Sequence, residues 1–255
     1  MQSLRLQKMK KIDTIVIAVG GQGRRITGDL RKRGIRSSKI FLTLNNKPIL
    51  SHLIDMSIAS DFKRFFLLSS YYESELRLYL KKNYPNDKRI VPVYGGKPGK
   101  KWGVPWLLNS IKGKLKEPFV YSDGNIVYDI DILRKIKNKG ISKTEIANIF
   151  LSAKDFAPTH SRVTLNKEKI SEINTRLPKF SNNTDNRLIG KKYYSLGLMV
   201  LRIQFFSINP RFVYKKDLDV VINDIFKFKG GSVKATIYQG NWIAIHTVQA
   251  PFSNQ

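Results

Sequence analysis

The sequence predicts an α/β protein in which helices cover a sheet of parallel strands, and three observations lead to this prediction. Residues 14–19 form a continuous, largely β-branched apolar run that ends in glycines, as expected for a strand buried on both faces. Behind Pro48, apolar residues from Ile49 to Ile58 recur at helical spacing. Strand and helix patterns then alternate along the first half of the chain, which is typical of parallel sheets with crossover helices.

The other elements are expected from the same kinds of pattern. In the first half we expect strands at 64–69, 90–94 and 119–121, and helices at 73–84, 104–112 and 130–137. Glycine, proline and lysine dominate residues 94–103, which predicts an irregular basic loop. From residue 146 the chain is expected to be mixed, with shorter strands at 162–165, 169–174, 198–203, 233–238 and 242–246 and a helix at 218–228.

Charge and composition narrow the classes of function. With 46 Lys and Arg against 19 Asp and Glu, the formal charge is +27, which favours polyanionic partners such as nucleotides, sugar phosphates, nucleic acid or an anionic membrane surface. A lysine-rich surface that is only solvated is the alternative. The hydrophobic content of 42% excludes wholesale disorder, and no apolar run approaches the ~20 residues of a transmembrane helix.

Residue usage and the N-terminal pattern give two further expectations. Cysteine is absent, which excludes disulfides, thiolate zinc sites and cysteine nucleophiles. Residues 1–12 are expected to form a basic, unpatterned lead-in. The apolar stretch behind them contains Asp13 and is cut off by glycines, unlike a signal peptide, so we expect a cytoplasmic protein.

A glycine-rich segment, GGQGRR at residues 20–25, follows the first buried strand. Its three glycines let backbone N–H groups approach a phosphate, although a tight turn alone would also explain them. Ile26 stands where the dinucleotide fingerprint needs its third glycine, and no Gly-Lys pair is followed by Ser or Thr as in a P-loop. The sequence therefore predicts a phosphate cradle of another kind.

The order and spacing of several short motifs carry a family resemblance. The segments GGQGRRI at 20–26, SK at 38–39 and KPIL at 47–50 are similar to G-G-x-G-T-R-L, P-K and K-P-x-[LI], the opening motifs of the sugar-1-phosphate nucleotidyltransferase family. Looser matches to G-T-x-x-A, G-D, N-x-G and W-x-D-I-G-T lie at 103–107, 122–123, 195–197 and 242–247. The resemblance spans residues 14–247 and implies a GT-A-like fold, with a Rossmann-like mixed sheet flanked by helices.

The resemblance also implies a reaction and its residues. An oxygen of a sugar-1-phosphate attacks the α-phosphate of a nucleoside triphosphate and releases pyrophosphate, while cations meet the charge that builds up on the phosphate oxygens. Arg25 and Lys39 match the two basic catalytic positions, and Asp123 matches the Mg²⁺-binding aspartate, with a turn role as the alternative. The implied nucleotide-binding residues are Gly20, Gly21, Gln22, Gly23, Arg24 and Gly103, and the implied sugar-phosphate-binding residues are His160, Arg176 and Gly197.

Some residues at the positions of the family's motifs differ from the family pattern. Arg24 replaces a small hydroxyl residue, and Arg176 stands where a lysine is expected, so both positions are basic. Ala244 takes the place of the second metal carboxylate and cannot bind an ion. His246 would share the strand face of Ala244, but imidazole is a poor magnesium ligand, and a packing histidine is the plainer interpretation.

We therefore expect one nucleotidyltransferase domain over residues 13–255, with a nucleotide-binding half at 13–140 and a sugar-phosphate-binding half at 141–255. Its expected cofactor is Mg²⁺, and its expected role lies in nucleotide-sugar and polysaccharide biosynthesis. A glycosyltransferase on the same fold, using a nucleotide-sugar, is one alternative, against which the Arg25 and Lys39 motif argues. A catalytically degenerate relative that binds nucleotide or another polyanion is the second, favoured by Ala244 and the charge.

Overall fold

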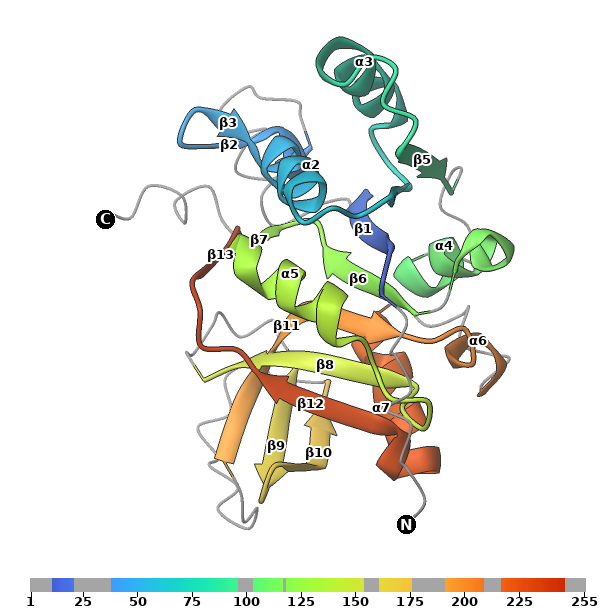
Figure 1. Cartoon of the computed structure of the whole chain (residues 1–255), viewed down its shortest axis with the longest axis vertical. Coiled ribbons are helices and arrows are strands. Elements are labelled where there is room, and N and C mark those ends of the chain that lie inside the picture. The colour runs from blue at the N-terminus through green and yellow to red at the C-terminus, as the bar shows by residue number, and fades with distance from the viewer. Residues whose placement is uncertain are drawn as a thin grey trace, which may run out of the picture.

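A computed structural model describes residues 11–20, 38–95, 103–116, 118–153, 161–175, 191–208 and 217–245. Within these residues the centre of the protein is a nine-stranded mixed sheet in the order β10-β9-β11-β6-β1-β4-β5, with β8 joined to β11 and β12 joined to β8 (Figure 1). The α/β fold with a mixed sheet flanked by helices is thus confirmed.

The first half of the chain supplies the parallel part of the sheet. Its strands are β1 (Thr14–Gly20), β4 (Arg64–Ser69), β5 (Ile90–Tyr94) and β6 (Phe119–Asp123), and each pairs in parallel with its neighbours in this group. Its helices are α2 (Ile49–Ala59), α3 (Glu73–Asn83), α4 (Val104–Ser110) and α5 (Ile130–Lys139). The short elements are a 3₁₀ helix (Lys39–Phe41), β2 (Thr43–Leu44), β3 (Lys47–Pro48) and β7 (Ile126–Tyr128).

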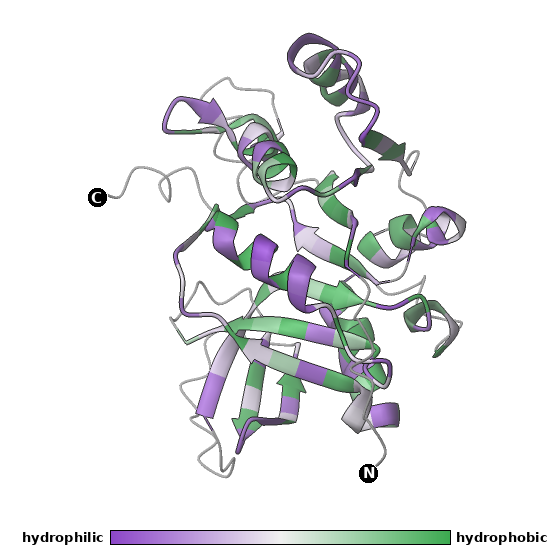
Figure 2. Ribbon diagram, in the orientation of Figure 1, coloured by the Kyte–Doolittle hydropathy of each residue, from purple (hydrophilic) through white to green (hydrophobic). Residues whose placement is uncertain are grey.

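Both faces of β1 are buried, which explains its unbroken apolar sequence. Ile15, Ile17 and Val19 enter the core cluster that also contains residues of α2 and α5. Val16 enters the opposite cluster, together with residues of α4 and α7 (Leu218–Lys229). Because successive side chains of a strand point to opposite faces, a strand between two helical layers needs apolar residues at every position. Figure 2 shows the resulting hydrophobic strands and the hydrophilic outer surfaces of α3 and α5.

The second half of the chain adds mostly antiparallel strands to the same sheet. They are β8 (Ala147–Ser152), β9 (Arg162–Asn166), β10 (Lys169–Asn174), β11 (Lys191–Leu201) and β12 (Val233–Ile237), while β13 (Trp242–Ala244) pairs separately with β7. A short helix, α6 (Phe205–Ile208), precedes α7. The long strand β11 pairs with β9 through Lys191–Tyr194 and with β6 through Leu198–Leu201.

Most of the expected elements are present, but several bounds differ: the helix expected at 104–112 ends at Ser110, and the strand expected at 242–246 ends at Ala244. The strands expected at 64–69, 90–94 and 169–174 have these bounds in the structure. The strand expected at 198–203 instead begins at Lys191 and ends at Leu201, because its hydrophilic first residues still pair with β9. The short strand β7 was not expected at all. No helix among the described residues is long and apolar enough to cross a membrane.

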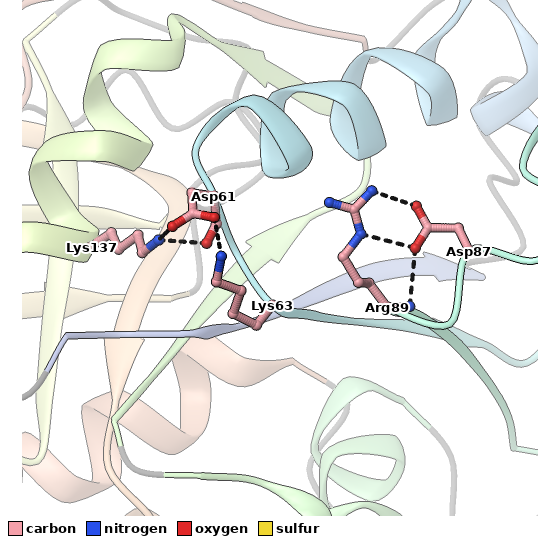
Figure 3. A network of polar contacts seen from close by, with 5 residues as sticks. All are labelled: Asp61, Lys63, Asp87, Arg89 and Lys137. Carbon is pink, nitrogen blue, oxygen red and sulfur yellow. Dashed lines mark hydrogen bonds and ion pairs between the residues drawn. The ribbon is translucent and has the colours of Figure 1, made fainter.

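A buried lysine ties α5 to the turn between α2 and β4 (Figure 3). Lys137 is 6% exposed, and its Nζ donates hydrogen bonds to Oδ2 of Asp61 at 2.7 Å and to the Asp61 carbonyl oxygen. Lys63 donates to the other carboxylate oxygen. These hydrogen bonds, that of Lys137 first, lower the pKa of Asp61 to about 2. The turn and the helix are therefore held together by a charged contact between a buried lysine and an exposed aspartate.

Candidate active site

The carboxyl ends of β1 and β6 lie side by side, and in parallel α/β sheets this edge is where ligands bind. Ala18 of β1 is paired with Asp123 of β6, and Gly20 with Ser69 of β4. A Cβ added to Gly20 would lie 2.6 Å from Oγ of Ser69 and closer still to its Cα, so only glycine fits there. Gly20, the first residue of the glycine-rich segment, therefore lets β1 end directly against β4.

Asp123 is the last residue of β6 and is partly buried. The Tyr121 hydroxyl donates a hydrogen bond to its Oδ1 at 2.5 Å. The other oxygen, Oδ2, lies against the backbone of Gly197 in β11. One carboxylate oxygen is thus bound by a tyrosine of the same strand and the other is packed against the neighbouring strand β11, which argues against a plain turn aspartate.

Gly197 makes room for this carboxylate. It has a φ of 62°, a conformation that side chains disfavour, and an added Cβ would lie 2.6 Å from Cγ of Asp123 and closer still to Oδ2. It sits where the pairing of β11 shifts register, and its N–H donates to the Ser195 hydroxyl at 3.3 Å. The structure thus gives Gly197, predicted as a sugar-phosphate residue, a second and structural reason to be glycine.

The charges around Asp123 include a cation that the sequence predicts. Lys39 begins the 3₁₀ helix and is partly buried. Burial raises the pKa of Asp123 above its ordinary value, while the Tyr121 hydrogen bond and the positive charge of Lys39 lower it. The structure thus brings Lys39 and Asp123, far apart in sequence, within electrostatic range of each other.

A second carboxylate near Asp123 was missed by the sequence reasoning. Asp217 precedes α7, and its negative charge also raises the pKa of Asp123. An aspartate just before a helix is usually a capping residue, yet its side chain accepts no capping hydrogen bond from α7, a helix that the structure describes throughout. Two residues on, Asp219 accepts a hydrogen bond from the Ser195 hydroxyl at 3.4 Å. The start of α7 is thereby linked, through Ser195 and Gly197, to Asp123.

The other predicted site residues divide into two groups. Gly103 is described: it has a φ of 104° and precedes α4, where its carbonyl oxygen accepts a hydrogen bond from the Leu107 N–H at 3.2 Å. Seven lie outside the described residues, namely Gly21, Gln22, Gly23, Arg24, Arg25, His160 and Arg176. His246 lies outside them as well.

Ala244 is the last residue of β13 and lies beside the turn that follows Asp123. It is paired with Ile126, and the next residue, Ile245, donates its N–H to the Asn125 carbonyl oxygen at 2.8 Å. Residue 244 therefore lies opposite the first residue after the turn that follows Asp123. As an alanine it offers no oxygen to a metal.

The donor set fits Mg²⁺ only in combination with a substrate. Across the part of the chain that the structure describes, no three His, Asp or Glu side chains gather into a metal-binding group. Mg²⁺ is commonly bound by one or two carboxylates together with substrate phosphates. Asp123, with its oriented carboxylate, and Asp217, within electrostatic range of it, supply donors of the right chemistry for that arrangement.

Several solved structures have a similar architecture, and two of them are described as nucleotide transferases. A putative glucose-1-phosphate thymidylyltransferase from Bacillus anthracis, in complex with a sucrose, superposes with a TM-score of 0.72 at 17% identity, covering 94% of this chain and 92% of that one. The inositol-1-phosphate CTP transferase from T. maritima gives 0.70 at 16%, covering 95% and 92%. HddC from Yersinia pseudotuberculosis, complexed with GMP-PN, gives 0.67 at 15%, covering 94% and 97%.

No family model and no curated protein sequence matches the chain. At 15–17% identity the structural likeness establishes the fold. The likeness extends over nearly the whole length of these chains. The chain thus has the nucleotidyltransferase fold that its motifs predicted.

Proposed function

We propose that the chain is a Mg²⁺-dependent sugar-1-phosphate nucleotidyltransferase, which transfers a nucleoside monophosphate from a nucleoside triphosphate to a sugar-1-phosphate. The observation that carries the proposal is the oriented Asp123 carboxylate at the end of β6, with the charge of Lys39 beside it. Its position at the carboxyl edge of the parallel strands is where such a fold binds ligands. The names of the similar structures, two of them transferases of nucleotides to phosphorylated sugars or inositol, support the reaction class.

The reaction forms one bond and breaks one. A phosphate oxygen of the sugar-1-phosphate bonds to the α-phosphorus, the bond from the α-phosphorus to the bridging oxygen breaks, and pyrophosphate leaves with the electron pair. Negative charge builds up on the oxygens around the α-phosphorus, and positioned cations stabilise it. In this proposal Lys39 supplies one such charge, and Arg25 supplies a guanidinium that can hold two phosphate oxygens.

The carboxylates of Asp123 and Asp217 have a different role in the proposed reaction. Asp123 and Asp217 would hold Mg²⁺ together with phosphate oxygens, and the ion would neutralise charge on the triphosphate. The hydrogen bond from Tyr121 orients Asp123, and Gly197 leaves room for its second oxygen. His160 and Arg176 remain proposed contacts for the sugar-phosphate.

A pyrophosphate-release screen tests the function. The full chain with Mg²⁺ is incubated with each of ATP, GTP, CTP, UTP and dTTP against a panel of sugar-1-phosphates, and pyrophosphate that forms only when both substrates are present is the expected result. Thermal melting with each triphosphate runs alongside, because a ligand that prefers the native state must raise the melting temperature. Stabilisation without any turnover would favour the degenerate nucleotide-binding alternative. A melting temperature that no triphosphate raises would contradict both the proposed enzyme and the nucleotide-binding alternative.

A further inference from the structure

A cavity lies between α5 and the strands β8 and β12, on a part of the protein that the proposed reaction does not use. Its volume is about 380 Å³, within the range of ~300–1,000 Å³ typical of small-molecule sites. Residues of all three elements line it, and Figure 1 shows α5 running alongside β8 and β12. We call it the α5–β12 pocket, and define it by Ile132, Lys135, Ile136, Lys139, Asn148, Phe150 and Ile237.

One part of the lining is apolar. Ile132 and Ile136 come from α5 and Phe150 from β8, and all three belong to the buried core. Ile237, at the end of β12, is 38% exposed, which is unusual for a large aliphatic side chain on a sheet. These four side chains offer a continuous apolar wall to any group that enters the pocket.

The side-chain amide of Asn148 gives the pocket a hydrogen-bonding group. Asn148 of β8 is 9% exposed, and its side-chain oxygen accepts a hydrogen bond from the Thr236 hydroxyl at 3.1 Å. Among the described residues its NH₂ group is not one of the fully buried polar atoms left without a partner, so it can face the opening of the pocket. A ligand acceptor that enters the pocket can therefore take a hydrogen bond from it.

The charges at the rim are separated along α5. Lys135 and Lys139 line the pocket one helical turn apart, are exposed, and form no ion pair within the described residues. At the other end Asp131 pairs with Arg134 at 3.7 Å, and the Asp129 side chain accepts a hydrogen bond from the Asp131 N–H. The acidic groups are therefore engaged locally, whereas the two lysines are left for an anion.

We propose that the α5–β12 pocket binds a small amphiphilic organic anion. Its apolar or aromatic body would lie against Ile132, Ile136 and Ile237, its acidic group between Lys135 and Lys139, and an acceptor atom at Asn148. None of the residues that line this pocket is Asp123, Lys39 or Asp217, and the proposal does not depend on the proposed function. An apolar wall, an amide donor and two lysines without an ion pair among the described residues are the combination that specifies an amphiphilic anion rather than a neutral lipid or a bare phosphate.

A fluorescent probe of this chemistry tests the proposal. The full chain is titrated with 8-anilinonaphthalene-1-sulfonate at fixed ionic strength, and saturable binding at one site is expected, with a Kd on the order of 10–100 µM for a ligand of this size. The charge-reversal double variant Lys135→Glu with Lys139→Glu should weaken binding by roughly 10-fold. The matched control, Lys81→Glu with Lys82→Glu on α3, changes the net charge equally and should bind as the wild type does. Millimolar nucleoside triphosphate with Mg²⁺ should not displace the probe.

Each contrary outcome rejects the site. Equal weakening in both double variants would mean that the probe responds only to net charge. Displacement by the triphosphate would place the probe at the triphosphate site, and unsaturable binding would mean that no defined pocket holds it. The neutral analogue N-phenyl-1-naphthylamine should bind the wild type and the Lys135 and Lys139 variant equally, since it lacks the sulfonate. Thermal melting of all variants verifies that these exposed substitutions leave the fold intact.

Discussion

Gly197 and Asp123 share one space, because Oδ2 of Asp123 occupies the position where any other residue at 197 would place its Cβ. The two residues belong to antiparallel neighbouring strands, β11 and β6, and they lie far apart in the sequence. The positive φ of Gly197 and the position of the carboxylate are therefore a single structural requirement.

Gly197→Ala should displace the Asp123 carboxylate and strain the backbone. We expect a loss of about 1–3 kcal/mol in the free energy of unfolding, from the positive φ and the overlap together. Nucleotidyl transfer should fall by ~10²-fold, since a catalytic group misplaced by about 1 Å has that effect. Chemical denaturation measures the change in the free energy of unfolding, and the pyrophosphate assay measures the change in the rate of nucleotidyl transfer. Gly231→Ala is the control, because an added Cβ there meets nothing within 4 Å; similar effects in both variants would contradict the shared-space requirement.

Lys39→Met keeps the aliphatic stem and removes the charge beside Asp123. We expect kcat to fall by at least ~10²-fold, the usual effect of losing one group that stabilises transition-state charge. The free energy of unfolding should change by less than about 0.5 kcal/mol. Lys82→Met, on the exposed surface of α3, should leave kcat unchanged. Near-normal turnover of Lys39→Met would mean that the motif reflects ancestry rather than chemistry.

Asp217→Asn removes the second negative charge near Asp123 with almost no change in shape. We expect the Mg²⁺ concentration for half-maximal activity to rise by about 10-fold, because fewer carboxylates attract the ion less strongly. Electron paramagnetic resonance of Mn²⁺ with a non-hydrolysable triphosphate measures the same loss without turnover. Glu75→Gln on α3 is the control for net charge. Unchanged Mn²⁺ binding would assign Asp217 to the structure alone.

Ala244→Asp should restore metal binding in the Asp217→Asn background. Residue 244 lies beside the turn that follows Asp123, so a carboxylate there would return an anionic oxygen to the same region. We expect the Mn²⁺ affinity of the double variant to recover by a factor on the order of 10. Without metal the new charge should lower the melting temperature, since a partly buried carboxylate is costly. Destabilisation with no recovery would show that residue 244 does not face the metal.

The contact of Asp61 with Lys137 should make stability depend on pH in the acid range. The folded pKa of Asp61 is about 2, below its ordinary 3.8, so its contribution is complete above pH ~4 and is lost as the pH falls toward 2. Asp61→Asn keeps a residue that tolerates the positive φ of 60° at this position. We expect the wild type to be the more stable protein at pH 6, and the difference between their melting temperatures to shrink between pH 4 and pH 2. A difference that is constant across this range would contradict the contact.

The sequence predicted those elements whose burial is local and regular. The strand β1 was recognisable because both of its faces are buried, and α2 because one apolar stripe faces the core. Strand β11 was only partly recognisable, since Lys191 and Lys192 at its start are exposed and join the sheet through backbone pairing with β9. Backbone pairing leaves little trace in residue type.

The candidate site shows the same limit. Lys39 and Asp123 stand in short motifs, which made them predictable, and the fold then brings their charges together. Asp217 carries no local signal that distinguishes it from a helix cap. Its proximity to Asp123 arises from the packing of α7 against β11, which only the tertiary structure determines.

The sharing of β11 between the two halves has a mechanical consequence. Its first residues pair with β9 and its last with β6, and β8 pairs with β11 on both sides of the register shift at Gly197. Hinged closure of one half over the other would have to break this continuous hydrogen-bonded ladder, unlike closure between domains joined only by flexible segments. The sheet therefore fixes the distance between the Asp123 edge and β9 before any substrate arrives.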